Sequence, residues 1–133
     1  MNFKLASISL LLVSSFVSIN IHGRFRFAAI ETSSQVSKDE AIKIKQLLIW
    51  VRDINQMKTD FSAKKSSMSL EETKNAKIIL HDLYRKFFSL KNSISKDAFS
   101  IVDKAIKSFN LDQQNKFMDT FIEELDRKIS SNE

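Results

Sequence analysis

Residues that could carry catalysis or bind a metal are few in this sequence and poorly spaced for either task. There is no cysteine, so thiolate ligands, cysteine nucleophiles and disulfides are all excluded. Of the two histidines, His22 and His81, neither has partners at the spacing of a zinc site. The acidic pairs Glu71-Glu72 and Glu123-Glu124 occupy adjacent positions, about 100° apart on a helix, and cannot converge on one substrate atom. We therefore expect no enzymatic activity, no metal and no cofactor.

Phenylalanine is the other residue type that could define a site. Nine of the eleven phenylalanines follow Arg24, and those in the second half of the chain are Phe87, Phe88, Phe99, Phe109, Phe117 and Phe121. Rings at helical spacing usually fill a core. They could also hold helices apart and line a slot for an alkyl chain, since lipid sites are apolar and polar only at the mouth. The residues alone leave both interpretations open.

Four amphipathic helices are expected to position these rings. Ser37 with Glu40, and Ser69 with Glu72, have the spacing of capping boxes, in which a hydroxyl and a carboxylate satisfy free backbone donors. Ser95 is expected to cap a third helix and Asn110 a fourth. The clearest stripe runs from Ser69 to Leu90 at three- and four-residue steps, and Thr59 to Met68 is the predicted first connection.

Composition agrees with a helical fold. The chain has 133 residues, no proline and one glycine, which suits one domain with few tight turns or strands. The predicted fold class is all-α, with four or more amphipathic helices in an irregular bundle or wedge around an apolar core or cavity. The net charge of +5 is mild and interspersed with acids, which favours a solvated mixed-charge surface over nucleic-acid binding.

The N-terminus indicates secretion. Lys4 precedes an apolar run from Leu5 to Val17, too short to span a bilayer and typical of a signal peptide. We predict a signal peptide at 1–23, a flexible N-terminal segment at 24–36 and a single helical domain at 37–133. The alternation of Arg and Phe from Arg24 to Phe27 could make transient contact with anionic lipid surfaces or pack as an arm.

Several segments resemble the nematode fatty-acid- and retinol-binding proteins. Ser95-Lys-Asp-Ala-Phe-Ser-Ile-Val-Asp-Lys-Ala-Ile106 resembles a Ser-capped helix of that family, and Leu80-His-Asp-Leu83 resembles the helix before it. Ala63-Lys-Lys-Ser66 and Ser37-Lys-Asp-Glu40 are similar to earlier segments, so the resemblance covers residues 37–109. It implies a secreted carrier that binds fatty acids, or retinol, in an internal apolar cavity without catalysis.

A candidate site follows if this resemblance holds. The expected lining is Leu80, Leu83, Phe87, Phe99, Val102, Ile106, Phe117 and Phe121. A carboxylate head group would be received at the mouth by Lys77, Arg85 or Lys86 through a charge-assisted hydrogen bond. Retinol would need only a hydroxyl partner.

A second resemblance is to the secreted nematode SXP-type antigens, which also carry a tryptophan on an early helix, as Trp50 does here. That alternative implies an interaction or antigen role, with a core filled by its own side chains and no lipid pocket.

Overall fold

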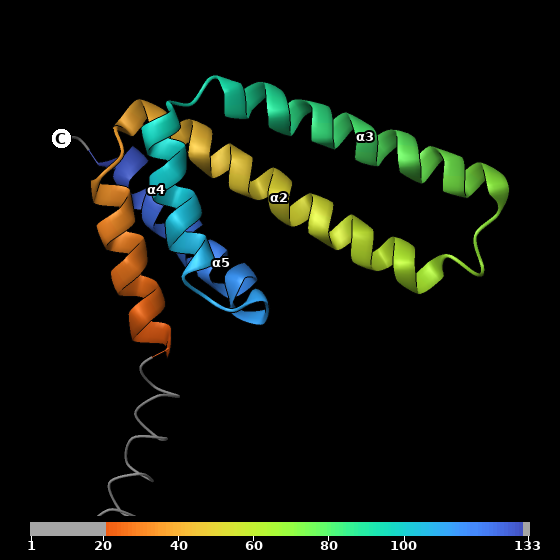
Figure 1. Ribbon diagram of the computed structural model, residues 1–133, viewed down its shortest axis with the longest axis horizontal. Helices are drawn as coiled ribbons and strands as arrows, with labels where there is room; N and C mark the ends of the chain where they lie inside the picture. Colours follow the sequence, from red (N-terminus) through yellow and green to blue (C-terminus); the bar gives the residue numbers. More distant parts are fainter. Residues whose placement is uncertain (1–20, 132–133) are drawn as a thin grey trace, which may run out of the picture.

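The computed structural model describes residues 21–131, and within them the chain is helical with no strand (Figure 1). A helix over residues 21–34 is followed by α2 (Lys38–Lys64), α3 (Leu70–Asn92), α4 (Lys96–Lys107) and α5 (Leu111–Ser130). The prediction of an all-helical bundle is confirmed. The predicted signal peptide lies outside the described residues except for its last three.

Local capping sets three of the helix starts as predicted. The side-chain oxygens of Ser37, Ser69 and Ser95 each accept a hydrogen bond from a backbone N–H three residues later, at 3.1 to 3.2 Å. Asn110 does stand before α5, but its side chain makes no capping hydrogen bond. The amide of Gln114 instead donates to the carbonyl of Phe109 at 3.1 Å.

α2 is the central element of the fold. It packs along α5 and along α3, so that it lies between them (Figure 1). Its fully buried residues are Ala41, Ile44, Leu47, Leu48 and Ile54, whereas α3 has none. The stripe that stood out most clearly in the sequence therefore belongs to a peripheral helix. α3 has only α2 as an extensive neighbour, and one neighbour cannot cover an apolar face fully.

The hairpin made by α2 and α3 projects from the rest of the molecule (Figure 1). α2 continues to Lys64, so the prediction of a connection beginning at Thr59 was wrong. Ile54, Met57 and Phe61 keep helical spacing and are all at least half-buried. Because this apolar period persists, the helix persists, and the connection is confined to residues 65–69.

The N-terminal segment is a packed helix, which corrects the prediction of a flexible stretch at 24–36. Phe25 is 1% exposed, and its ring lies 4.8 Å from that of Phe109 and 6.2 Å from that of Phe117. Ala29 is fully buried, and the ammonium of Lys128 in α5 donates to the carbonyl of Ser33. The sequence Arg24 to Phe27 alternates with a period of two, which obscured the helical spacing of the buried residues Phe25, Ala29 and Thr32.

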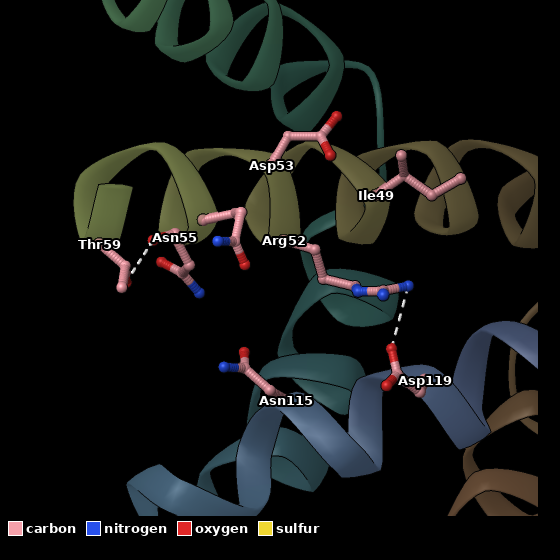
Figure 2. A pocket seen from close by; sticks show the side chains of 8 residues that line it. Ile49, Arg52, Asp53, Asn55, Thr59, Asn115 and Asp119 are labelled. Carbon is pink, nitrogen blue, oxygen red and sulfur yellow. Dashed lines mark hydrogen bonds and ion pairs between the residues drawn. The ribbon is translucent and has the colours of Figure 1, made fainter. Parts of the chain in front are cut away.

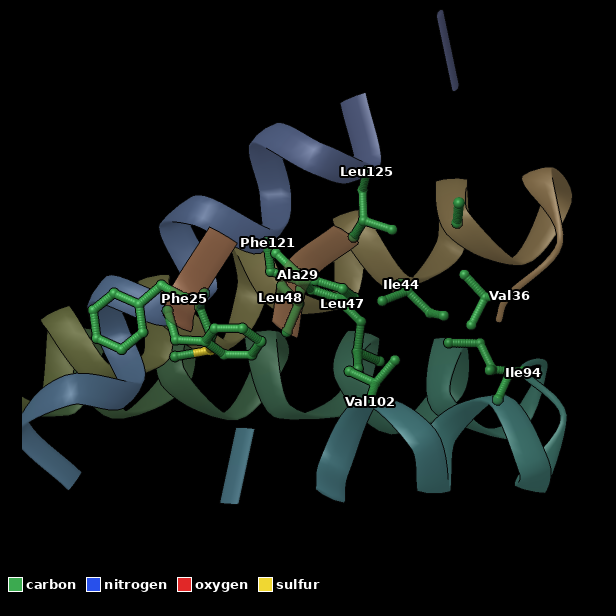
Figure 3. Packing of buried hydrophobic residues seen from close by; sticks show 14 of the residues in the cluster. Phe25, Ala29, Val36, Ile44, Leu47, Leu48, Ile94, Val102, Phe121 and Leu125 are labelled. Atoms are coloured by element: carbon green, nitrogen blue, oxygen red, sulfur yellow. The ribbon is translucent and has the colours of Figure 1, made fainter. Parts of the chain in front are cut away.

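The hydrophobic core lies where the N-terminal helix, the first half of α2, α4 and α5 meet (Figure 3). The Phe109 and Phe117 rings are 4.7 Å apart, and those of Phe117 and Phe121 are 5.7 Å apart. Ile44 and Leu48 supply the α2 side of the core. The close contacts between rings show that most of the aromatic cluster is packed against itself, as in an ordinary protein interior.

Candidate functional site

An apolar groove of about 340 Å³ lies beside this core, between α2, α4 and α5. The end of α3 closes one side of it. The apolar residues that line the groove are Leu47, Leu48, Val51, Phe87, Phe99, Val102, Ile106, Leu111 and Met118. We call this feature the apolar groove. Because it is a groove open to solvent, the structure does not show the internal cavity that the resemblance implied.

Four of the predicted lining residues meet in the apolar groove. Phe99, Val102 and Ile106 come from one face of α4, at steps of three and four residues, and Phe87 comes from the penultimate turn of α3. The short connection between these helices brings the two faces together. Its Ile94 is buried in the core, and Lys43 of α2 donates to a backbone carbonyl in that connection at 3.1 Å.

The other predicted lining residues lie elsewhere. Phe117 and Phe121 have no exposed surface and belong to the core with Phe25. Leu80 and Leu83 are half-buried on α3, outside the groove. In the sequence both pairs have the same helical spacing as the residues that do line the groove. Helical spacing shows that residues share one face of a helix, but it does not show which element packs against that face.

The α2 wall of the groove was not among the predicted site residues. Leu47, Leu48 and Val51 form it, and Met118 of α5 faces them. The signal in the sequence that could have identified them is the width of the apolar stripe on α2. Because Leu47 and Leu48 are adjacent, this stripe is broad enough to contact both the core and the groove.

One end of the groove is polar. Asn55, Gln114 and Asn115 line it there, and the two asparagines also line a neighbouring hollow of about 370 Å³. The fourth polar residue of the groove is Asp103 of α4, whose carboxylate pairs with Lys107 at 2.8 Å. Figure 2 shows Asn55 and Asn115 reaching from α2 and α5 into the space between these helices. In that hollow the Arg52 guanidinium pairs with the Asp119 carboxylate at 3.0 Å. The site thus combines an apolar trough with amide groups and an ion pair at its end.

The three cations predicted to receive a carboxylate lie away from this end. Lys77 is exposed on α3. Lys86 and Arg85 pair with Asp82 on the same helix, at 3.2 and 2.7 Å, and their hydrogen bonds hold the pKa of the Asp82 carboxyl below its ordinary value. Both line a separate depression beside Trp50. Arg52, which the sequence did not single out, is the cation beside the polar end of the groove.

Between residues 21 and 131, no three side chains of His, Asp or Glu gather as metal ligands would. Over that range, no helix has both the length and the apolar character needed to cross a membrane.

Comparison with protein-family models, with curated proteins and with solved structures finds no match to this chain. Its kinship with the nematode fatty-acid- and retinol-binding proteins stays a prediction.

Proposed function

We propose that the protein is a secreted lipid carrier that binds the alkyl chain of a fatty acid in the apolar groove. The observation that carries this proposal is the convergence of Phe87, Phe99, Val102 and Ile106 with the α2 wall around a mainly apolar groove. Its volume of about 340 Å³ lies within the range of roughly 300–1,000 Å³ found for small-molecule sites. Secretion rests on the apolar run near the N-terminus.

Burial of the chain supplies the binding free energy in this proposal. Each methylene moved from water into the groove contributes about 0.8 kcal/mol. Leu111, which is 83% exposed at the rim, would gain cover when a chain lies beside it.

The polar end orients the ligand. Asn55 and Asn115 offer amide donors to a carboxylate, and Arg52 lies beside them with a guanidinium that a carboxylate could share with Asp119. A retinol hydroxyl would need only one amide partner, so the same groove suits both ligands.

A titration with a fluorescent fatty-acid analogue, followed by displacement with oleate and with retinol, tests the proposal. We expect a saturable, blue-shifted signal that both competitors reverse. The matched variants are Phe87→Asp and Phe88→Asp, because only Phe87 lines the groove, whereas Phe88 is 52% exposed and meets the Phe87 ring edge to face from outside it, with the ring centroids 5.3 Å apart. Phe87→Asp should weaken binding at least tenfold, since it places a charge among apolar groups. Equal affinities for the two folded variants would count against the groove.

A second variant fills the groove without adding charge. Ile106→Trp places an indole in the trough from its half-buried position on α4. We expect the fold to be kept and ligand affinity to fall at least tenfold, because the chain and the indole compete for one volume. Undiminished uptake by this variant would mean that the ligand binds elsewhere.

The alternative is an interaction or antigen protein of the SXP type without a lipid site. The close packing of Phe109, Phe117 and Phe121 favours it, because these rings fill the core themselves. A flat titration by a correctly folded protein would favour this alternative over the carrier.

A further inference from the structure

One exposed side of α3 is both apolar and basic. Leu70, Ile78 and Phe88 are 88%, 57% and 52% exposed on it. Lys74, Lys77 and Arg85 lie between them and are also exposed. Residues 70, 74, 77, 81, 85 and 88 follow one another at three- and four-residue steps, so they share one side of the helix. Ile78, four residues after Lys74 and seven before Arg85, lies at one edge of this side. We call this side the outer face of α3.

Acidic residues border the outer face on one edge. By helical position Glu71 and Asp82, seven residues before and four residues after Ile78, lie next to it, whereas Glu72 lies on the opposite side of α3. Asp82 pairs with Arg85 at 2.7 Å and partly neutralises it. No ion pair is present for Lys74 or Lys77 among residues 21–131, so these two lysines supply most of the positive field.

The length and position of the face suit a broad, flat partner. From Leu70 to Phe88 the face extends for about 27 Å at the helical rise of 1.5 Å per residue. It belongs to the projecting hairpin, in which α3 lies on the far side of α2 from α5 (Figure 1). Lys64 and Lys65 add two exposed cations at the turn next to Leu70.

The chemistry of the face selects among partners. A second copy of the chain would bring lysines against lysines, which repel. A polyanion without apolar groups would leave Ile78 and Phe88 in water. An anionic membrane surface satisfies both components, because its head groups attract the cations and its acyl boundary accepts the apolar side chains.

We infer that the outer face of α3 docks the protein on an anionic membrane surface, with Ile78 and Phe88 at the acyl boundary and Lys74 and Lys77 at the phosphates. This inference does not rest on ligand binding in the groove. If both hold, docking brings the groove close to the bilayer, because Phe87 in the groove and Phe88 on the face are consecutive residues.

The absence of cysteine allows a direct test of orientation. Two single-cysteine variants are labelled with an environment-sensitive fluorophore: His81→Cys on the outer face and Lys116→Cys on α5. Each labelled protein is mixed with vesicles of phosphatidylglycerol or of phosphatidylcholine. We expect the label at position 81 to shift to the blue with the anionic vesicles alone and the label at position 116 to stay unchanged. Equal shifts at the two positions would overturn the inference.

Matched variants test the two chemical components by vesicle co-sedimentation. Lys74→Glu with Lys77→Glu should weaken partitioning by about 25-fold or more, since each lysine near an anionic surface contributes about fivefold. Lys96→Glu with Lys116→Glu changes the net charge equally on α4 and α5 and should stay within about twofold. The apolar run near the N-terminus is the same in every variant, so it cancels in these comparisons.

Ile78→Ser and Ile42→Ser form the apolar pair, because their side chains are 57% and 51% exposed. Ile78→Ser should lower partitioning roughly tenfold, as expected when an aliphatic side chain no longer enters the acyl boundary. Ile42→Ser should have no effect. No difference within this pair would overturn insertion and indicate that charge alone holds a partner, as an acidic protein could. Circular dichroism confirms that each variant is folded.

Discussion

The helix over residues 21–34 provides a sharp test of the fold, because two phenylalanines in it differ only in where they point. Phe25 is 1% exposed and contacts the rings of Phe109 and Phe117, whereas Phe27 is 70% exposed. Replacing a buried phenylalanine by alanine costs about 3–5 kcal/mol. We expect about 3 kcal/mol for Phe25→Ala, the lower end of this range. Phe27→Ala should cost less than about 0.5 kcal/mol.

Urea denaturation followed by far-ultraviolet circular dichroism measures both variants. For a chain of this size, about 3 kcal/mol corresponds to a fall in Tm of roughly 10–15 °C. The slope of unfolding free energy against urea should be unchanged, since the same surface is exposed on unfolding. Free energies of unfolding that agree within about 0.5 kcal/mol would refute the packing of this helix and restore the prediction of a flexible segment.

Two further predictions concern local interactions. Ser69→Ala should cost about 1 kcal/mol in urea denaturation because its hydroxyl caps α3, whereas Asn110→Ala should cost little because that side chain makes no cap. A larger loss for Asn110→Ala would contradict this. Lys86 and Arg85 lower the pKa of Asp82, so their stabilisation is present above the ordinary carboxyl pKa and is lost as pH falls through the lowered value. Carboxyl NMR titration should show the Asp82 pKa rising in Lys86→Gln or Arg85→Gln; an unchanged value would refute the pairing.

Prediction of the fold succeeded where the signal was local. Ser37, Ser69 and Ser95 start helices as expected, because a capping hydrogen bond involves only four consecutive residues. Prediction of the fold failed where the apolar period of a helix was judged without knowing which helices pack against it. The α2 stripe was not followed past Thr59, although Phe61 continues it.

The candidate site was predictable in part for the same reason. Phe99, Val102 and Ile106 lie on one face of one helix, so their convergence needed only the period of α4. Phe117 and Phe121 have equally good spacing but face the N-terminal helix, and they became core instead. Their burial depends on the helix over residues 21–34, and the sequence pattern did not reveal that this helix packs against α5.

The sequence by itself determined the all-helical class and most helix starts, because caps and apolar period act within one or two turns. The tertiary structure decided which stripes are core, groove or exposed face, because burial depends on the neighbours that a helix meets. α3 shows this most clearly: it has the cleanest stripe, yet no residue of it is fully buried, since the projecting hairpin offers it one extensive neighbour. That same position leaves its outer face uncovered and sets Phe87 at the edge of the groove.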